Sequence, residues 1–180
     1  MPDVASPIPF MPPVKPACLP LSPERETELR RKVIEVAMRW EHTPYRDQGS
    51  VMGGAIDCAM LLVNAWVGAA VFEPFDPRPY PPSWHLHHSE ERYLDWMASI
   101  SREVEVWRPG DIVIWQFGRC FSHGGIIVND HAHVLHALKE FGECIVTDMD
   151  EAFLGWIGKG RKVTPRPRKF FDVFAAIRGA

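Results

Sequence analysis

The stretch GGAIDCAMLLVNAW, residues 53–66, runs from a flexible loop into a predicted helix. Asp57 is a favourable N-cap residue, and the residues that then recur at helical spacing are Cys58, Leu61, Leu62, Ala65, Trp66 and Ala69. Unpaired N–H groups at a helix start favour negative charge, so this position suits a thiol nucleophile with a depressed pKa. A cysteine on an apolar stripe is, taken alone, more often a core residue.

Two further helical patterns flank this stretch. Residues 22–40, SPERETELRRKVIEVAMRW, predict a helix with Ser22 as its N-cap. Residues 89–104, SEERYLDWMASISREV, predict a third helix. Prolines and glycines predict loops over residues 41–55 and 72–88. Loops held between helices often carry functional sites.

The second half of the chain has the pattern of strands. Short runs rich in β-branched and aromatic residues cover residues 108–117, 122–129, 133–138 and 143–149. Helices followed by strands predict an α+β fold with an antiparallel sheet. The last segment predicts a basic loop, residues 159–169, followed by an edge strand over 170–174.

Length and composition indicate one domain. A chain of 180 residues has room for one sizeable core, which we expect in residues 24–180, after a proline-rich arm over residues 1–23. The arm lacks the features of a secretory signal, and no apolar run has the roughly 18 residues of a membrane helix, so we expect synthesis in the cytoplasm and no membrane insertion. A formal net charge of -3 gives no reason to expect a nucleic-acid partner. The four cysteines form no CxxC pair, so we expect no disulfide framework.

Two histidines lie on neighbouring predicted strands. If Asn129 and Asp130 form a two-residue hairpin turn, His123 lies directly opposite His136. A register two residues longer makes them diagonal neighbours, and both registers place them on one face. Glycines at 124 and 125 would leave open space beside the pair. A strand histidine is usually structural, but a helix-start cysteine combined with two paired histidines indicates thiol catalysis.

Other clusters carry weaker signals. The histidines of WHLHH, residues 84–88, lack a carboxylate or cysteine at ligand spacing, so we expect no metal site. Cys120 is a rival nucleophile without a helix start to lower its thiol pKa, and Cys58 is therefore preferred. The basic residues 159–169 are typical of a solvated loop, with contact to an anionic glycan or a partner protein as the alternative.

Five short motifs follow one another along the chain. They are TPYR (43–46), DC (57–58), PGD (109–111), SHGGIIV (122–128) and LHA (135–137). This order resembles the NlpC-type cell-wall peptidases, a papain-like family of cysteine hydrolases, over the segment from Ile34 to Leu138. The stretches PYPPSWHLHHSEERYL and FGRCFSHGGIIV resemble the shorter bacteriophage-tail type of that family.

The resemblance implies a fold, an activity and a set of site residues. The fold is papain-like, with N-terminal helices packed on an antiparallel sheet. The activity is hydrolysis of peptide bonds in peptidoglycan stem peptides, next to D-glutamate, without a cofactor or metal. By position, Cys58 matches the nucleophile, His123 the base and His136 the residue that orients it. Tyr45 matches a tyrosine near the oxyanion site, where a hydroxyl helps to stabilise the tetrahedral intermediate.

The substrate site departs from the family pattern beside the nucleophile. The family commonly follows the cysteine with Ser-Gly, whereas this chain has Ala59 and Met60. Asp57 matches the acidic residue before the cysteine, which we interpret chiefly as a helix cap. We expect Asp57, Ala59 and Gly124 to line the substrate site.

The resemblance to phage-tail members predicts a location and leaves two alternatives. We expect a virion tail component that opens the cell wall during infection, with peptidoglycan and other tail proteins as partners. A structural tail-assembly protein with a vestigial site is one alternative. A different papain-like amidase or acyltransferase is the other.

Overall fold

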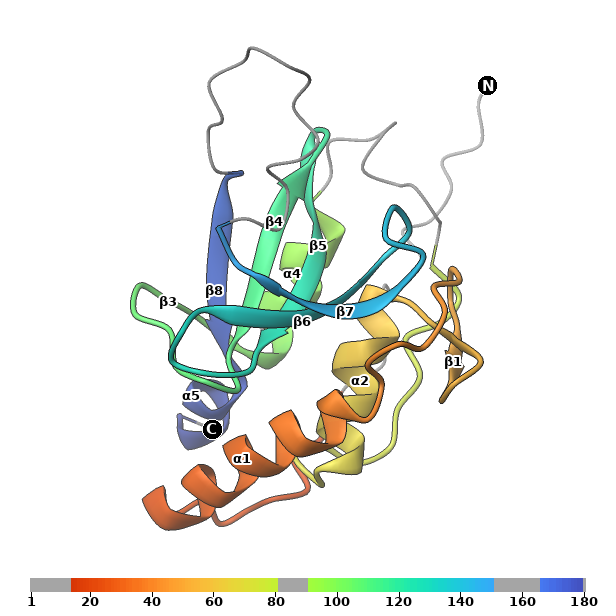
Figure 1. Cartoon of the computed structure of the whole chain (residues 1–180). Coiled ribbons are helices and arrows are strands. Elements are labelled where there is room, and N and C mark those ends of the chain that lie inside the picture. Colours follow the sequence, from red (N-terminus) through yellow and green to blue (C-terminus); the bar gives the residue numbers. More distant parts are fainter. Residues whose placement is uncertain (1–13, 81–90, 151–165, 180) are drawn as a thin grey trace, which may run out of the picture.

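The computed structural model describes residues 14–80, 91–150 and 166–179 (Figure 1). Its helices are α1 (Pro23–Met38), α2 (Cys58–Gly68), α4 (Arg92–Ile100) and α5 (Val173–Arg178). Its strands are β1 (Ser50–Val51), β2 (Ala55–Ile56), β3 (Arg102–Val104), β4 (Ile112–Phe117), β5 (Cys120–Ile127), β6 (His133–Leu138), β7 (Glu143–Asp148) and β8 (Arg168–Asp172).

The strands confirm the predicted antiparallel sheet. Within the described residues, six strands form one sheet in the order β3-β8-β4-β5-β6-β7, and every neighbouring pair is antiparallel. The short strands β1 and β2 form a separate hairpin, which begins inside the predicted loop 41–55 and ends at Ile56. The α+β class follows from this arrangement, because the helices and the sheet come from largely separate parts of the chain.

The helices α1 and α2 begin where the sequence predicts. The Ser22 side chain accepts a hydrogen bond from the N–H of Arg25, and Pro23 is the first residue of α1. Asp57 caps α2 in the same way. Both helices therefore start at residues that satisfy backbone donors of the first turn.

The third predicted helix is shorter than its sequence pattern. α4 ends at Ile100, and residues 102–104 form β3 instead. Ser101 adopts an extended backbone, and its hydroxyl donates to the carbonyl of Met97, so the side chain takes over one of the carbonyls left at the helix end. The strand that follows is held at the sheet edge by its pairing with β8.

The predicted edge strand over 170–174 is wrong in two respects. β8 lies between β3 and β4, so it is an inner strand. It also ends at Asp172, where the carboxylate accepts hydrogen bonds from the N–H groups of Phe174 and Ala175 and so starts α5. The sequence pattern did not predict β3 as a strand. Without β3, β8 would be the edge strand of the sheet, which is why the prediction placed it there.

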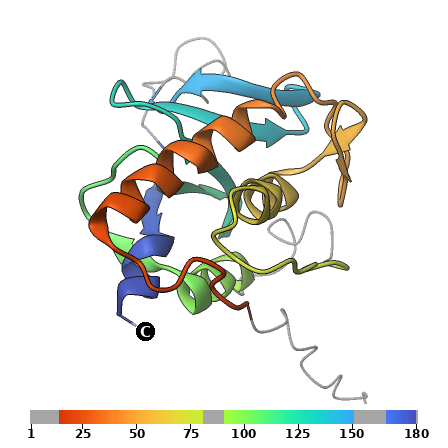
Figure 2. The same ribbon diagram turned by 90° about the horizontal axis from the view of Figure 1, so that it is seen from below.

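The helices cover one face of the sheet. The larger core cluster joins side chains of α1, α2, α4 and α5 to sheet residues that include Ile112, Ile114, Ile126, Leu135 and Phe171. In Figure 2, α1 crosses the molecule beside α2, and α5 lies near the first turns of α1. A smaller cluster on the opposite face contains Val113, Trp115, Ile127, Val134 and Met149.

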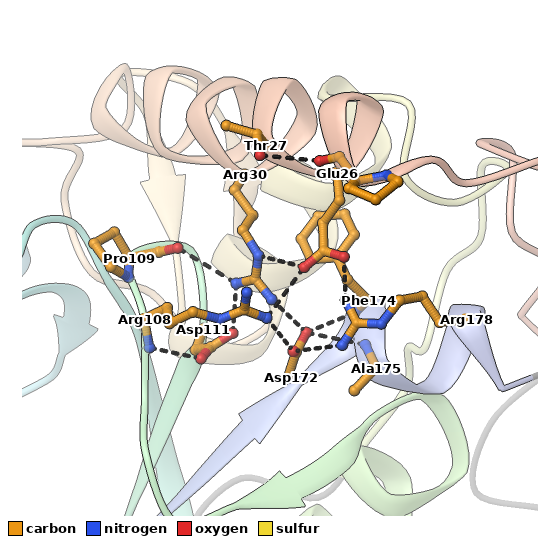
Figure 3. Close-up of polar contacts among 11 residues, drawn as sticks. Glu26, Thr27, Arg30, Arg108, Pro109, Asp111, Asp172, Phe174, Ala175 and Arg178 are labelled. Atoms are coloured by element: carbon orange, nitrogen blue, oxygen red, sulfur yellow. Dashed lines mark hydrogen bonds and ion pairs between the residues drawn. The ribbon is translucent and has the colours of Figure 1, made fainter.

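Buried ion pairs around Arg30 join three elements (Figure 3). Its guanidinium lies 2.9 Å from the carboxylate of Glu26, 2.6 Å from that of Asp111 and 2.7 Å from that of Asp172. The ring of Phe174 packs against the same guanidinium at 4.7 Å. These contacts connect α1 to the start of β4 and to the junction of β8 and α5.

Several predictions concern residues outside the described part of the chain. These are residues 1–13 of the arm, the histidines of residues 84–88, and residues 159–165 of the basic run. No helix in the described ranges is both long enough and apolar enough to cross a membrane.

Candidate active site

Asp57 organises the start of α2. One carboxylate oxygen accepts a hydrogen bond from the N–H of Met60 at 2.8 Å. The other accepts from the N–H of Gln48 at 2.6 Å and from the hydroxyl of Tyr80 at 2.7 Å. Burial raises the pKa of Asp57, and these hydrogen bonds oppose that rise. The interpretation of Asp57 as a helix cap is confirmed, and its contact with substrate stays a prediction.

Cys58 is the first residue of α2 and the one cysteine of the chain that is not classed as a buried residue. All four cysteines lie in the described ranges; Cys58 is half-buried, and the buried ones are Cys18, Cys120 and Cys144. Burial, reinforced by the carboxylate of Asp57, raises the pKa of the Cys58 thiol to about 12. The N–H groups of Gly124, Ala59 and Cys58 itself oppose this rise without cancelling it. The expected depressed pKa is therefore wrong, and the resting thiol is protonated.

The strands β5 and β6 are paired over a short distance only, at Ile126 with Leu135 and at Ile127 with Val134. Towards the start of β5, the N–H of Gly124 hydrogen-bonds to the sulfur of Cys58. The thiol therefore lies against the residue that follows His123.

His123 and His136 lie on the same face of the hairpin, as predicted. The Nε2 atom of His123 is 2.8 Å from the Nδ1 atom of His136. The pairing of β5 with β6 has the longer of the two expected registers, which makes the histidines diagonal neighbours. Both side chains are buried, at 3% and 0% exposure, so water does not compete for this contact.

Of the two hairpin registers that the sequence left open, the one with a two-residue turn at Asn129 and Asp130 is not formed. The N–H of Val128 donates to the carbonyl of His133, which leaves four residues in the turn. The Asn129 side chain accepts hydrogen bonds from the N–H groups of His131 and His133, and Ala132 has a positive φ of 60°. An asparagine that bonds its own turn in this way favours the longer loop.

His136 is neutral and is hydrogen-bonded at both ring nitrogens. Burial lowers the pKa of His136 to about 4, so this imidazole is neutral at physiological pH. Its Nε2 atom is 2.9 Å from the hydroxyl oxygen of Thr147 on β7. When Nε2–H of His136 donates to Thr147, its Nδ1 accepts from Nε2–H of His123. The lone pair of His123 then lies on Nδ1, which is the form a general base requires.

Aromatic packing holds both imidazoles in place. The Trp115 ring lies 5.6 Å from His123, nearly parallel to it, and 5.6 Å from His136. Phe117 packs edge-on against His123 at 5.4 Å. These contacts restrict rotation of the histidine side chains about their χ angles.

All three tyrosines of the chain lie near the Cys58 thiol. Burial raises the pKa of each one, and negative charge on Cys58 raises it further, which places Tyr45, Tyr80 and Tyr93 within electrostatic reach of the sulfur. Of these, only Tyr45 was expected. The Tyr45 hydroxyl donates a hydrogen bond to the carboxylate of Asp47 at 2.8 Å, so its proton is not free to be donated to a substrate.

The sequence gave little indication of three further site residues. Tyr80 ends a proline-rich stretch, Tyr93 belongs to α4, and Thr147 lies on the predicted strand 143–149. The contact of Thr147 with His136 depends on the register of β6 with β7, where Thr147 pairs with Val134. Strand pattern alone does not fix that register.

The open space expected beside Gly124 and Gly125 is filled by neighbouring side chains. A methyl group on Gly124 would lie 2.5 Å from the hydroxyl oxygen of Tyr93, and one on Gly125 would lie 2.9 Å from Cβ of His136. Ala59 is buried in the core and directs only its N–H towards the sulfur of Cys58. Substrate contacts by Gly124 and Ala59 stay predictions.

The described residues contain no group of three or more His, Cys, Asp or Glu side chains arranged to hold a metal ion. The Cys58 sulfur lies against Gly124, and the preceding residue, His123, is hydrogen-bonded to His136.

Comparison with known proteins identifies the fold. Neither a family model nor a curated protein matches the sequence. Among solved structures, NlpC1 from Trichomonas vaginalis matches with a TM-score of 0.54 and 15% identity, over 79% of this chain and 42% of NlpC1. The peptidoglycan hydrolase RipB from Mycobacterium tuberculosis matches with a TM-score of 0.54 and 16% identity, over 85% of this chain and 68% of RipB. The fold is that of NlpC/p60 domains.

A third structure supports the same NlpC/p60 assignment. The P60 domain of an antigen from M. avium subspecies paratuberculosis matches with a TM-score of 0.50 and 15% identity, over 82% of this chain and 96% of that domain. The expected papain-like fold is confirmed. The chain spans less than half the length of NlpC1, and at these identities the likeness establishes the fold alone.

Proposed function

We propose that this protein is a cysteine peptidase that hydrolyses amide bonds in peptidoglycan stem peptides. The observation that carries the proposal is Cys58 at a helix start, whose sulfur accepts a hydrogen bond from Gly124, the residue that follows His123 of the buried pair His123 and His136. The NlpC/p60 fold, which the hydrolase RipB shares, supports peptidoglycan as the substrate. Cleavage next to D-glutamate rests on the sequence resemblance.

In the proposed reaction, the thiol loses its proton during the attack. Because burial and Asp57 keep the thiol protonated at rest, Nδ1 of His123 takes the proton as the sulfur bonds to the carbonyl carbon. The imidazolium that forms on His123 keeps its Nε2–H directed at the neutral His136, which Thr147 orients. His123 then protonates the leaving amine, and water hydrolyses the thioester on Cys58.

The backbone at the start of α2 is suited to the negative charge of the reaction. The N–H groups of Cys58 and Ala59 both face the sulfur, where a helix start favours an anion. Tyr45 lies nearby, as the resemblance implies, but its hydroxyl must leave Asp47 before it donates to an oxyanion. We therefore assign the main stabilisation of the tetrahedral intermediate to backbone N–H groups.

The test of this function is hydrolysis of purified peptidoglycan by the full chain and two cysteine variants. Cys58→Ala is expected to lower the release of soluble fragments at least a thousandfold, because the nucleophile is lost. Cys120→Ala removes the rival thiol and is expected to retain activity. Loss of activity in Cys120→Ala with retention in Cys58→Ala would overturn the assignment, and inhibition by a chelator would point to metal chemistry instead.

We further propose a virion tail component that opens the cell wall locally during infection. The proposal rests on the resemblance of residues 79–94 and 117–128 to phage-tail members of the family. Mass spectrometry of purified particles is expected to detect the chain, together with tail proteins that bind it. Its consistent absence from infectious particles would contradict this location.

A further inference from the structure

Tyr93 is a buried residue that the mechanism above leaves without a role. Its hydroxyl oxygen is fully buried and lies close to the sulfur of Cys58. Apart from that sulfur, the hydroxyl has no hydrogen-bond partner among the residues that the structure describes. Buried hydroxyls are normally paired, so one that faces a reactive atom calls for a functional explanation.

Contacts of α4 with β5 and with α2 fix the position of Tyr93. The carboxylate of Glu91 accepts a hydrogen bond from the N–H of Phe121 at 2.9 Å, which holds the start of α4 against β5. The Tyr93 ring packs edge-on against Trp96 at 5.4 Å, and Trp96 packs against Trp66 at 5.9 Å. Trp66 belongs to α2, the helix that starts with the nucleophile. The phenol is therefore held relative to the thiol by the packing of α4 on α2.

Gly124 leaves the space that the Tyr93 hydroxyl occupies. A methyl group at this position would lie 2.5 Å from the hydroxyl oxygen and 3.2 Å from the ring carbon that bears it. The N–H of Gly124 also hydrogen-bonds to the sulfur of Cys58. One glycine thus brings two donors, its own N–H and the phenol hydroxyl, to the same sulfur.

We propose that Tyr93 donates a hydrogen bond to the Cys58 sulfur as the thiolate forms, and so sets the reactivity of the nucleophile. Tyr93 is suited to this role because its hydroxyl is not engaged by another acceptor, whereas Tyr45 donates to Asp47 and Tyr80 donates to Asp57. The inference rests on the proposed role of Cys58 as the nucleophile.

Burial and a nearby carboxylate disfavour the thiolate of Cys58, and a hydrogen bond from Tyr93 would offset part of this cost. The titratable groups around the sulfur are Asp57 at the helix start, the three tyrosines, and His123 beside Gly124. The carboxylate of Asp57 opposes ionisation of the thiol. Burial raises the pKa of Tyr93 well above its ordinary value, so the hydroxyl keeps its proton and remains a donor. Hydrogen bonds to charged acceptors are stronger than neutral ones.

The test measures thiol ionisation directly, without peptidoglycan. Iodoacetamide labelling of Cys58 is followed by peptide mass spectrometry between pH 6 and 10 in the full chain and its variants. Tyr93→Phe keeps the ring and removes the hydroxyl, and we expect labelling of Cys58 at pH 8 to slow roughly tenfold, with its pH profile moved to higher pH. Gly124→Ala, which displaces the hydroxyl, is expected to act in the same direction.

Ser99→Ala is the matched control, because it removes a hydroxyl from the same helix that bonds only the carbonyl of Trp96. Its labelling profile is expected to match that of the wild type. An unchanged profile in Tyr93→Phe would overturn the inference while leaving the peptidase proposal in place. Loss of peptidoglycan hydrolysis in Cys58→Ala tests the peptidase proposal separately, so the two failures are distinguishable.

Discussion

The buried neutral state of His136 predicts a specific loss of stability in acid. Its pKa is lowered from 6.5 to about 4 in the folded protein, because burial disfavours the imidazolium. The unfolded chain therefore binds one more proton at this residue between pH 6.5 and 4, and the folded state loses stability as the pH falls through that window. The contribution of His136 to this loss amounts to roughly 3 kcal/mol. This is a large part of the 5–15 kcal/mol that usually separates folded from unfolded domains.

Urea unfolding of two variants isolates this contribution. His136→Gln does not titrate, so between pH 7.5 and 4.5 it is expected to lose roughly 2–3 kcal/mol less stability than the wild type. His131→Gln changes an exposed histidine in the hairpin turn and is expected to follow the wild type. The reasoning fails if His136→Gln and the wild type lose stability in parallel, because His136 would then be charged in the folded protein.

Two further substitutions test the packing that supports the site. Arg30→Met leaves the buried carboxylate of Asp111 without its arginine, while Glu26 and Asp172 keep Arg108 and Arg178, and it is expected to cost about 3–5 kcal/mol in denaturant unfolding. Arg25→Met breaks an exposed pair with Glu28 and should cost under about 1 kcal/mol; equal losses would contradict the buried network. Gly125→Ala places a methyl group 2.6 Å from Val134 and is expected to cost about 1–3 kcal/mol and to lower hydrolysis, while Gly179→Ala, with no neighbour closer than 3.6 Å, should do neither.

The features that could be predicted from the sequence are those that depend on residues close together in the chain. Ser22 and Asp57 start helices because their side chains bond backbone N–H groups within the next three residues. The placement of His123 and His136 on one face follows from strand alternation, which gives the same face in both of the registers that the sequence left open. Local chemistry and strand period were sufficient for these features.

The features that were missed depend on contacts between distant segments. β3 exists because β8 returns from the C-terminal end of the chain to pair with it, and no pattern within residues 101–104 shows this partner. Tyr93 and Thr147 reach the site through the packing of α4 and the register of β7, neither of which is encoded next to Cys58. The prediction of a depressed thiol pKa was wrong for a similar reason. The sequence indicates the helix start at Cys58, but the burial that raises the pKa depends on segments far away in the chain.

The central claim is that Cys58 attacks an amide of the stem peptide. The most direct measurement is mass spectrometry of the fragments that the full chain releases from defined muropeptides, compared with those released by Cys58→Ala. The wild type is expected to give two fragments that together equal the substrate plus one water, with a new free amine next to D-glutamate, and Cys58→Ala is expected to give neither. Equal release of these fragments by both proteins would contradict the account.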